Sequence, residues 1–79
     1  MRRQRVAVAF GKVLKDLRMQ VGMTQEELAV EAEFDRTYPS LLERGLRTPT
    51  LSVIISLAKV LKTTAPALVN KTLEEMARR

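Results

Sequence analysis

The sequence predicts an all-α protein, folded as a compact bundle of five helices. Two observations predict this class: apolar residues recur at steps of three and four, and residues suited to capping helices stand between the apolar segments. Glycine and proline occur only three times each, and few strand-forming residues alternate with polar ones. With 79 residues the chain has room for one domain, 1–79, with a core over about 6–69 and a C-terminal helix over 65–79.

The first helix is indicated by one apolar face near the start of the chain. The residues of this face are three or four positions apart. They are Val6, Phe10, Val13, Leu14, Leu17 and Val21. Gly22 is placed to end the helix, because glycine takes the left-handed conformation of a C-terminal cap at little cost.

The second helix opens at Thr24, which forms a capping box with Glu27. In this motif the threonine hydroxyl accepts from the backbone N–H of residue 27, and the Glu27 carboxylate accepts from the N–H of residue 24. Met23 before the cap and Leu28 after it are placed for a hydrophobic staple. The inward positions are Leu28, Ala29 and Ala32, and the solvent face carries Glu26, Glu31 and Glu33.

The third helix is expected to be capped by Asp35 and to run to about Arg44, where Gly45 stops it. Pro39 would then stand at the fourth helical position, where its ring crowds the Asp35 carbonyl and its missing N–H removes an intrahelical hydrogen bond. Proline also biases the preceding Tyr38 away from helical angles. We therefore expect this helix to start late or to bend in its first turn, and Pro39 to contribute little to the core.

Two further helices follow a loop over residues 46–49. Thr50 is expected to cap the fourth helix, whose inward positions are Leu51, Ile54, Ile55, Ala58 and Leu61. Thr64 is expected to cap the fifth helix, with Pro66 in the first turn, where a missing N–H is harmless.

The composition excludes several classes of function. Without cysteine or histidine the chain lacks disulfides, the usual zinc ligands and the commonest general base, so no enzyme, metal site or cofactor is expected and no small-molecule ligand is evident. The net charge of +5 favours a polyanionic partner; solubility alone and, less well, a membrane surface are the alternatives. No apolar run approaches the roughly 20 residues that span a bilayer and no secretion signal is evident, so a cytoplasmic protein is predicted.

Residues 14–61 carry a collinear series of motifs. They are Leu17-Arg18, Gly22-Met23-Thr24-Gln25-Glu26-Glu27-Leu28-Ala29, Arg36-Thr37-Tyr38, Ser40, Leu42-Glu43-Arg44-Gly45 and Arg47-Thr48-Pro49-Thr50. In this order and spacing the chain resembles the Xre/Cro/C1 family of helix-turn-helix DNA-binding domains. The Asp35-Arg36-Thr37-Tyr38 string and the length are similar to restriction–modification controller proteins within that family, while phage repressors and antitoxin DNA-binding domains share much of the pattern. The resemblance implies a lambda-repressor-like bundle whose helices two and three form the helix-turn-helix, with helix three in the major groove.

Candidate DNA contacts in the helix-turn-helix follow from this resemblance and from side-chain chemistry. Gln25 is implied to contact a phosphate at the N-terminus of helix two. On helix three, placed at about 36–44, Arg36 is expected to reach guanine O6 and N7 with two donors. Thr37 and Ser40 are expected to contact a base or a phosphate, and Tyr38 either donates to a phosphate or packs sideways against the helix.

Further candidates flank the helix-turn-helix. The residues around the loop after helix three are expected to contact phosphates and to fix the register on DNA. They are Arg44, Arg47, Thr48 and Thr50. The basic N-terminal run of Arg2, Arg3 and Arg5 is interpreted as a solvated tail, with an arm that reaches DNA as the alternative.

Three positions matched by the resemblance concern the fold. Arg18 and Glu43 are implied to form an ion pair that ties helix one to helix three. Glu33 stands in the turn between helices two and three, where the family often has glycine. Glutamate fits there only with the strain of a positive φ or with a changed turn.

The leading prediction is a sequence-specific regulator of transcription that binds double-stranded DNA as a homodimer on a pseudo-palindromic operator. The fifth helix carries the candidate dimer interface, with packing inside the chain as the alternative. The interface residues are Leu68, Val69, Leu73 and Met76. The alternative function is an antitoxin or other protein-interaction module that binds a different protein through the same helix.

Overall fold

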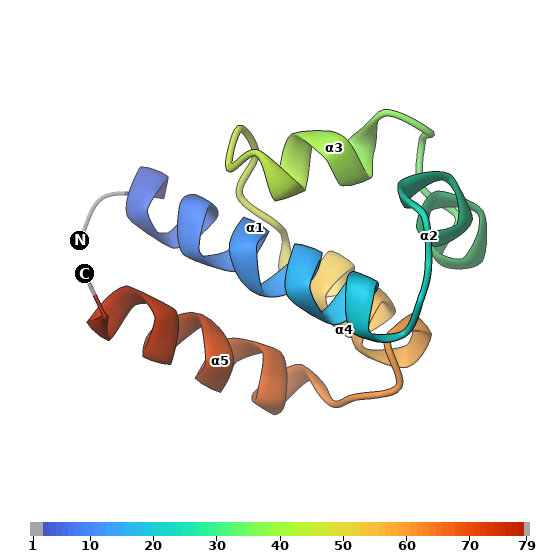
Figure 1. The fold of residues 1–79 in the computed structure, drawn as a ribbon. Helices are drawn as coiled ribbons and strands as arrows, with labels where there is room; N and C mark the ends of the chain where they lie inside the picture. Colours follow the sequence, from blue (N-terminus) through green and yellow to red (C-terminus); the bar gives the residue numbers. More distant parts are fainter. Residues whose placement is uncertain (1–2, 79) are drawn as a thin grey trace.

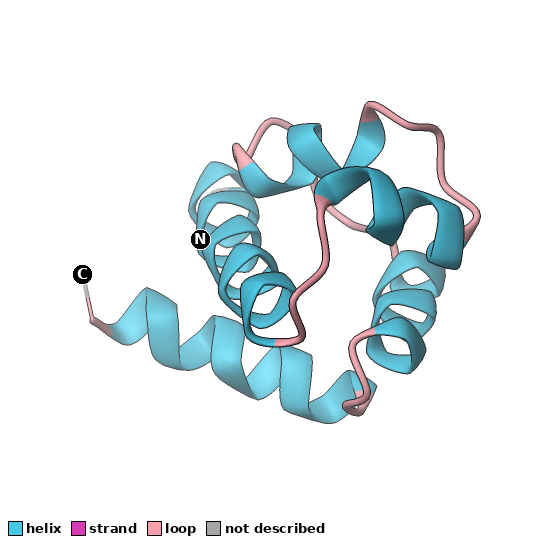
Figure 2. Ribbon diagram, turned by 45° about the vertical axis from the view of Figure 1, so that its right-hand side comes forward, coloured by secondary structure: helices cyan, strands magenta, loops and turns pink. Residues whose placement is uncertain are grey.

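The computed structural model describes residues 3–78 and folds them into five α-helices (Figure 1). The helices are α1 (Arg3–Gln20), α2 (Gln25–Ala32), α3 (Tyr38–Glu43), α4 (Leu51–Val60) and α5 (Ala65–Ala77). Over this described range the chain forms only helices, turns and loops (Figure 2). The all-α, five-helix prediction is confirmed.

The long helix α1 lies between two other elements. It packs side by side and antiparallel with α5 on one flank, and α3 crosses it on the other (Figure 1). The second helix α2 packs against α3 and α4, and α4 also contacts α5. The core between them is built on side chains that are fully buried: Leu14, Leu28, Pro39, Leu42, Leu57 and Leu68.

Three predicted threonine caps begin helices. The Thr24 hydroxyl accepts from the Glu27 N–H at 3.0 Å, and Glu27 Oε1 accepts from the Thr24 N–H at 2.8 Å, which completes the capping box. Thr50 and Thr64 each accept from a backbone N–H three residues later, at 3.2 Å. At the other end of α1, Gly22 takes a φ of 74° as expected for a C-terminal cap.

The turn after α2 has the left-handed conformation that favours glycine, although the residue is Glu33. Its φ and ψ are 58° and 40°. The N–H of Phe34 then donates to the Ala29 carbonyl at 2.8 Å and closes the turn. The strained alternative of the sequence analysis is therefore the one that occurs. Lys62 after α4 has the same φ of 58°.

The predicted inward face of α4 is wrong at two positions. Leu51 is 71% exposed and Ile55 is 46% exposed, whereas Leu57 is fully buried. Because α4 is apolar around most of its circumference, spacing alone does not distinguish the stripe that meets α2 and α5 from the stripe beside it. Val21 also differs from prediction: it lies beyond the last turn of α1 and is exposed.

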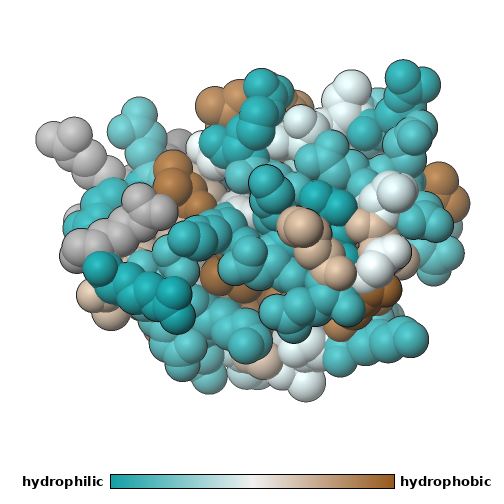
Figure 3. Space-filling view, viewed as in Figure 1, coloured by the Kyte–Doolittle hydropathy of each residue, from teal (hydrophilic) through white to brown (hydrophobic). Residues whose placement is uncertain are grey.

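The face of the molecule in Figure 3 is mainly hydrophilic, with small separate hydrophobic spots. Within residues 3–78, no single helix is both long enough and apolar enough to cross a membrane. The pair α4 and α5 reaches that length together, but it is bent by 105° at the junction.

Candidate nucleic-acid interface

The N-terminus of α2 presents Gln25 directly after the Thr24 cap. The Gln25 side chain is half-buried, and its Nε2 donates to Glu43 Oε1 at 3.1 Å. A primary amide has two N–H donors, so this bond leaves one for a phosphate. The helix N-terminus adds free backbone N–H groups and the positive end of the helix dipole.

Helix α3, the candidate recognition helix, is shorter than predicted. It spans Tyr38–Glu43 instead of about 36–44, and its N-cap is Thr37, with no side-chain capping bond, rather than Asp35. Arg36 and Thr37 lie in the turn before the helix, and both side chains are exposed. The late start agrees with one of the two outcomes expected from Pro39.

Pro39 itself is placed differently from the prediction. It stands at the second position of α3, where the missing N–H is one of those that no helix satisfies internally, so it breaks no hydrogen bond. The expected crowding of the Asp35 carbonyl at a fourth helical position therefore does not arise. The ring is also fully buried, so the expected loss of core packing at this position is wrong.

Two residues of α3 lie at the edge of the core. Tyr38 is half-buried and packs edge-on against Phe34, with ring centroids 5.2 Å apart and planes at 88°. The ring of Tyr38 therefore packs on the turn after α2, and its hydroxyl as a phosphate donor stays a prediction. Ser40 is also half-buried, one turn after the cap.

The loop after α3 carries exposed cations. Arg44 and Arg47 are exposed, and Arg47 Nη1 donates to the neighbouring Leu46 carbonyl at 3.0 Å. Among residues 3–78, no carboxylate forms an ion pair with Arg36, Arg44 or Arg47. Arg36 does lie close enough to the neighbouring Asp35 carboxylate to interact with its charge, but without an ion-pair contact.

The two threonines of that loop have structural surroundings. The Thr50 hydroxyl caps α4 and lies 3.0 Å from Ser52 Oγ. Thr48 is exposed and lines an apolar groove between α1, α4 and α5. Of the N-terminal arginines, Arg5 is exposed on the first turns of α1, and Arg2 lies outside the described residues.

An ion pair joins α1 to the end of α3. Arg18 Nε donates to Glu43 Oε2 at 2.6 Å and Arg18 Nη2 donates to Glu43 Oε1 at 3.0 Å, a bidentate arrangement. The Glu43 side chain is only 3% exposed, and its hydrogen bond to the arginine raises the pKa of Arg18. With Gln25 on the same carboxylate, Glu43 links the three helices that carry or support the candidate contacts.

The candidate dimer residues of α5 divide into two pairs. Leu68 is fully buried and Met76 is 8% exposed, so both belong mainly to the core of the chain, and Leu68 is not available to a partner. Val69 and Leu73 are exposed and one turn apart. They line the apolar groove of about 270 Å³, together with Phe10, Pro49 and Ile54.

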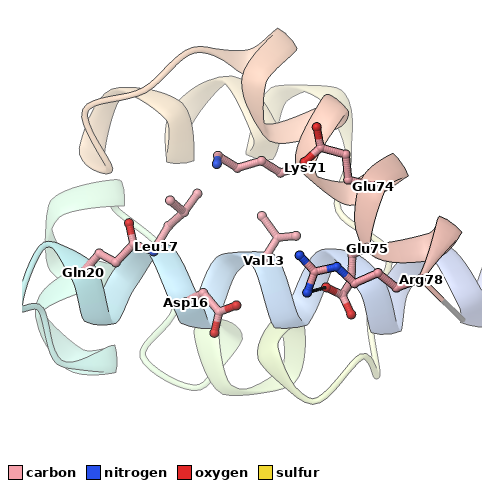
Figure 4. Close-up of a pocket in the computed structure, with 8 residues that line it drawn as sticks. All are labelled: Val13, Asp16, Leu17, Gln20, Lys71, Glu74, Glu75 and Arg78. Atoms are coloured by element: carbon pink, nitrogen blue, oxygen red, sulfur yellow. Dashed lines mark ion pairs between the residues drawn. The ribbon is translucent and has the colours of Figure 1, made fainter.

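A second, polar hollow of about 130 Å³ lies between α1 and α5 (Figure 4). Glu75 is buried there and forms ion pairs with Lys12 at 3.6 Å and Arg78 at 3.9 Å. Asp16, Lys71 and Glu74 also line it. Of these charges, the ion pair between Lys12 and Glu75 links the two antiparallel helices.

Two further residues, Gly11 and Asp35, position the candidate interface but are not among the site residues predicted from the sequence. Gly11 is buried in the middle of α1, against the backbone of α3. Asp35 holds the turn before α3 through its carboxylate. The glycine within a helix is a sequence signal for close approach. The turn role of Asp35 competes with its role as an N-cap, and the sequence does not separate the two.

Comparisons with known proteins agree with this arrangement. Residues 9–71 match the family model described as a helix-turn-helix domain. The chain is 41% identical, over 71% of its length and 73% of the relative, to the HTH-type transcriptional regulator y4dJ of Sinorhizobium fredii.

Solved structures give the same result. The restriction–modification controller protein C.AhdI from Aeromonas hydrophila has a TM-score of 0.75 and 39% identity, over 78% of this chain and 94% of that one. The controller protein C.Esp1396I, solved as a tetramer with its natural 35-base-pair operator, has a TM-score of 0.80 and 30% identity, over 91% of this chain and 95% of that one. Regulators of this kind are not enzymes, as the composition predicts. The chain belongs to the helix-turn-helix family of DNA-binding transcriptional regulators.

Proposed function

We propose that the protein is a sequence-specific regulator that binds double-stranded DNA as a homodimer, with α3 and the turn before it in the major groove. The observation that carries this proposal is the set of exposed arginines around α3 that no acid of the described chain pairs: Arg36, Arg44 and Arg47. Exposed, unpaired guanidinium groups are suited to phosphates and to guanine.

The proposed DNA contacts are of two kinds: one reads a base, and the others position the protein on the phosphates. Arg36 is the candidate base reader, because its side chain leaves the exposed turn at the start of α3. The candidate phosphate contacts are Arg44 and Arg47, which follow the C-terminal end of α3, and Gln25 at the start of α2. Phosphate contacts fix the register on DNA but carry no sequence information. Ser40 and Tyr38 lie between the two groups on α3.

A second copy of the chain is the proposed occupant of the apolar groove. The groove is lined by exposed Val69 and Leu73 and continues the core of each subunit through Phe10 and Ile54. The similar controller protein C.Esp1396I is a tetramer on its operator, which supports assembly of several copies. A two-fold dimer would read a pseudo-palindromic site with half-sites one helical turn, or a multiple of it, apart. We expect this regulator to act in the cytoplasm.

Selection of binding sites from random duplex DNA at near-physiological salt tests the proposal. The wild type should recover an inverted repeat, and Arg36→Ala should lose one base preference in each half-site. Arg78→Ala at the end of α5 removes the same charge far along the chain from α3 and should leave the motif unchanged.

The opposite result is also informative. If weak, salt-sensitive binding persists without any motif, the protein neutralises phosphates but reads no sequence, and the proposed function is wrong. The antitoxin-like alternative would then be favoured. In that case Leu73→Glu would abolish binding of a protein partner, while Arg36→Ala would not affect it.

A further inference from the structure

A tight turn over residues 35–38 presents Arg36 at the start of the recognition helix. The Tyr38 N–H donates to the Asp35 carbonyl at 3.0 Å and closes the turn. The Asp35 carboxylate Oδ2 accepts from the Thr37 N–H at 3.1 Å and also from the Thr37 hydroxyl. Both the backbone and the side chain of Asp35 therefore hold this turn, and Arg36 stands at its outer corner.

We propose that Asp35 is a positioning residue for DNA readout by Arg36, and that Thr37 acts on DNA as a hydrogen-bond acceptor. The inference rests on the proposed function, since it assigns roles within the same interface. Asp35 is exposed, and the hydrogen bonds of its carboxylate are local ones to Thr37.

The positioning role follows from the geometry that an arginine needs to read a base. A bidentate contact to guanine requires the guanidinium plane to meet O6 and N7 together. The side chain of Arg36 is long and exposed, and within the described residues it makes no hydrogen bond. Its direction is therefore set by the backbone of the turn, which Asp35 fixes, and by the charge of the Asp35 carboxylate nearby. A pre-set direction reduces the entropy lost on binding.

The role of the Thr37 hydroxyl as a hydrogen-bond acceptor follows from its having a single proton to donate. A hydroxyl has one proton and two lone pairs, and an ionised carboxylate only accepts. The hydrogen bonds from the Thr37 hydroxyl and N–H hold the pKa of Asp35 below its ordinary value of 3.8, so this carboxylate is ionised at neutral pH. The proton of Thr37 is thus committed to Asp35, and its lone pairs remain.

The remaining partners of Thr37 in the major groove are hydrogen-bond donors. These are the amino groups at N4 of cytosine and N6 of adenine, while the threonine methyl group can contact the methyl of thymine. This differs from the sequence-based expectation, in which Thr37 could also donate to a phosphate.

The test compares binding-site selection by the full chain in the wild type and four variants: Asp35→Ala, Asp35→Asn, Arg36→Ala and Thr37→Val. We expect Asp35→Ala to lose about tenfold in discrimination at the same base pair that Arg36→Ala affects. Its affinity for random DNA should not fall, because a negative charge has been removed. Asparagine keeps an oxygen that accepts both bonds, so Asp35→Asn should restore the preference. Thr37→Val should weaken it and also remove a preference at an adjacent base pair.

Different failures are distinguishable. A wild type without a motif contradicts the proposed function. If the wild type has a motif and Asp35→Ala leaves it intact, this inference alone is overturned. It is also overturned if Asp35→Asn behaves like Asp35→Ala, because the charge of Asp35 rather than the turn would then be responsible. Melting curves show whether each variant is folded. If Asp35→Ala is not folded, Thr37→Val decides, and an unchanged preference at the Arg36 base overturns the inference.

Discussion

Gly11 of α1 faces the carbonyl oxygen of Leu42 in α3 so closely that a Cβ at residue 11 would lie 2.4 Å from that oxygen. The same Cβ would lie 2.7 Å from the Glu43 carbonyl oxygen. Both neighbours are backbone atoms, which cannot rotate away as the end of a side chain can. The absence of a side chain at residue 11 therefore sets the distance between α1 and the last turn of the recognition helix.

Replacing this glycine should destabilise the protein. Gly11→Ala gains helix propensity of about 1 kcal/mol, but overpacking costs typically about 1–3 kcal/mol and here acts on backbone. We expect a net loss, seen as a melting temperature lower by several degrees, since about 1 kcal/mol corresponds to roughly 4–8 °C in a domain of this size. Lys15→Ala, at an exposed position of the same helix, should leave the melting temperature nearly unchanged. An equal effect of both substitutions would contradict the close approach.

The left-handed turn at Glu33 gives a prediction of opposite sign. Glu33→Gly should raise the free energy of unfolding by about 1 kcal/mol, because a residue with a Cβ is strained at a φ of 58° and glycine is not. Glu31→Gly, in the last turns of α2, should lower it by about 1 kcal/mol. Urea unfolding of both variants measures the two changes. If both glycines destabilise, residue 33 does not have a positive φ.

The carboxylate shared by Arg18 and Gln25 should be important for stability. Glu43→Ala leaves the largely buried Arg18 guanidinium without its counter-charge, although its hydrogen bond to the Met23 carbonyl remains, and breaking such an ion pair costs about 3–5 kcal/mol. For a chain of this length we expect most of the protein to be unfolded at 37 °C. Circular dichroism during heating measures this. Glu43→Gln, which keeps an acceptor oxygen, should lose less, and an unchanged melting curve for Glu43→Ala would show that the pair is absent.

The turn before α3 should respond to acid. Hydrogen bonds from Thr37 lower the pKa of Asp35, so the folded chain binds a proton there less readily than the unfolded chain. Their stabilising contribution is complete above the ordinary value of 3.8 and is lost as the pH falls through the lower folded pKa. An NMR titration of the Asp35 carboxyl carbon should give a midpoint below 3.8 in the wild type and a midpoint closer to 3.8 in Thr37→Val. Equal midpoints would mean that the hydroxyl does not hold the carboxylate.

The proposed dimer predicts an assembly defect at one exposed position of α5. Leu73→Glu places a charge in the apolar groove, so we expect dimer affinity to fall about tenfold or more, seen by analytical ultracentrifugation. Leu73 is 52% exposed in the single chain, so the fold should tolerate this change. The control Val30→Glu, at a position of α2 that is 76% exposed, should leave the mass unchanged. If Leu73→Glu remains dimeric, the dimer interface does not lie in this groove.

The sequence predicts the fold where local chemistry decides the structure. The capping box of Thr24 and Glu27 and the turn at Gly22 depend on residues close in the chain, and both occur where expected. The resemblance to the helix-turn-helix family, which often has glycine at this place, points to a strained or changed turn at Glu33, and its φ of 58° is the strained case.

The site was less predictable because it depends on neighbours that are distant in sequence. Asp35 can cap a helix or hold a turn, and burial of Pro39 against the core favours the turn with a later helix start. Leu51 and Ile55 have the spacing of core residues, but α2 and α5 cover a different side of α4. Gly11 shows its role only when the backbone of α3 is placed beside it.

The anchoring of α3 separates residues of the helix that carry the fold from exposed residues at its two ends. Its inward side is held by Pro39, Leu42 and Glu43, while Arg36 and Arg44 are exposed and take part in none of these contacts. The exposed residues can therefore be substituted while the packing of α3 against the core stays the same. A protein engineer who wanted to redirect the proposed DNA readout could therefore randomise Arg36 and Arg44, and the library would sample new binding preferences on an unchanged fold.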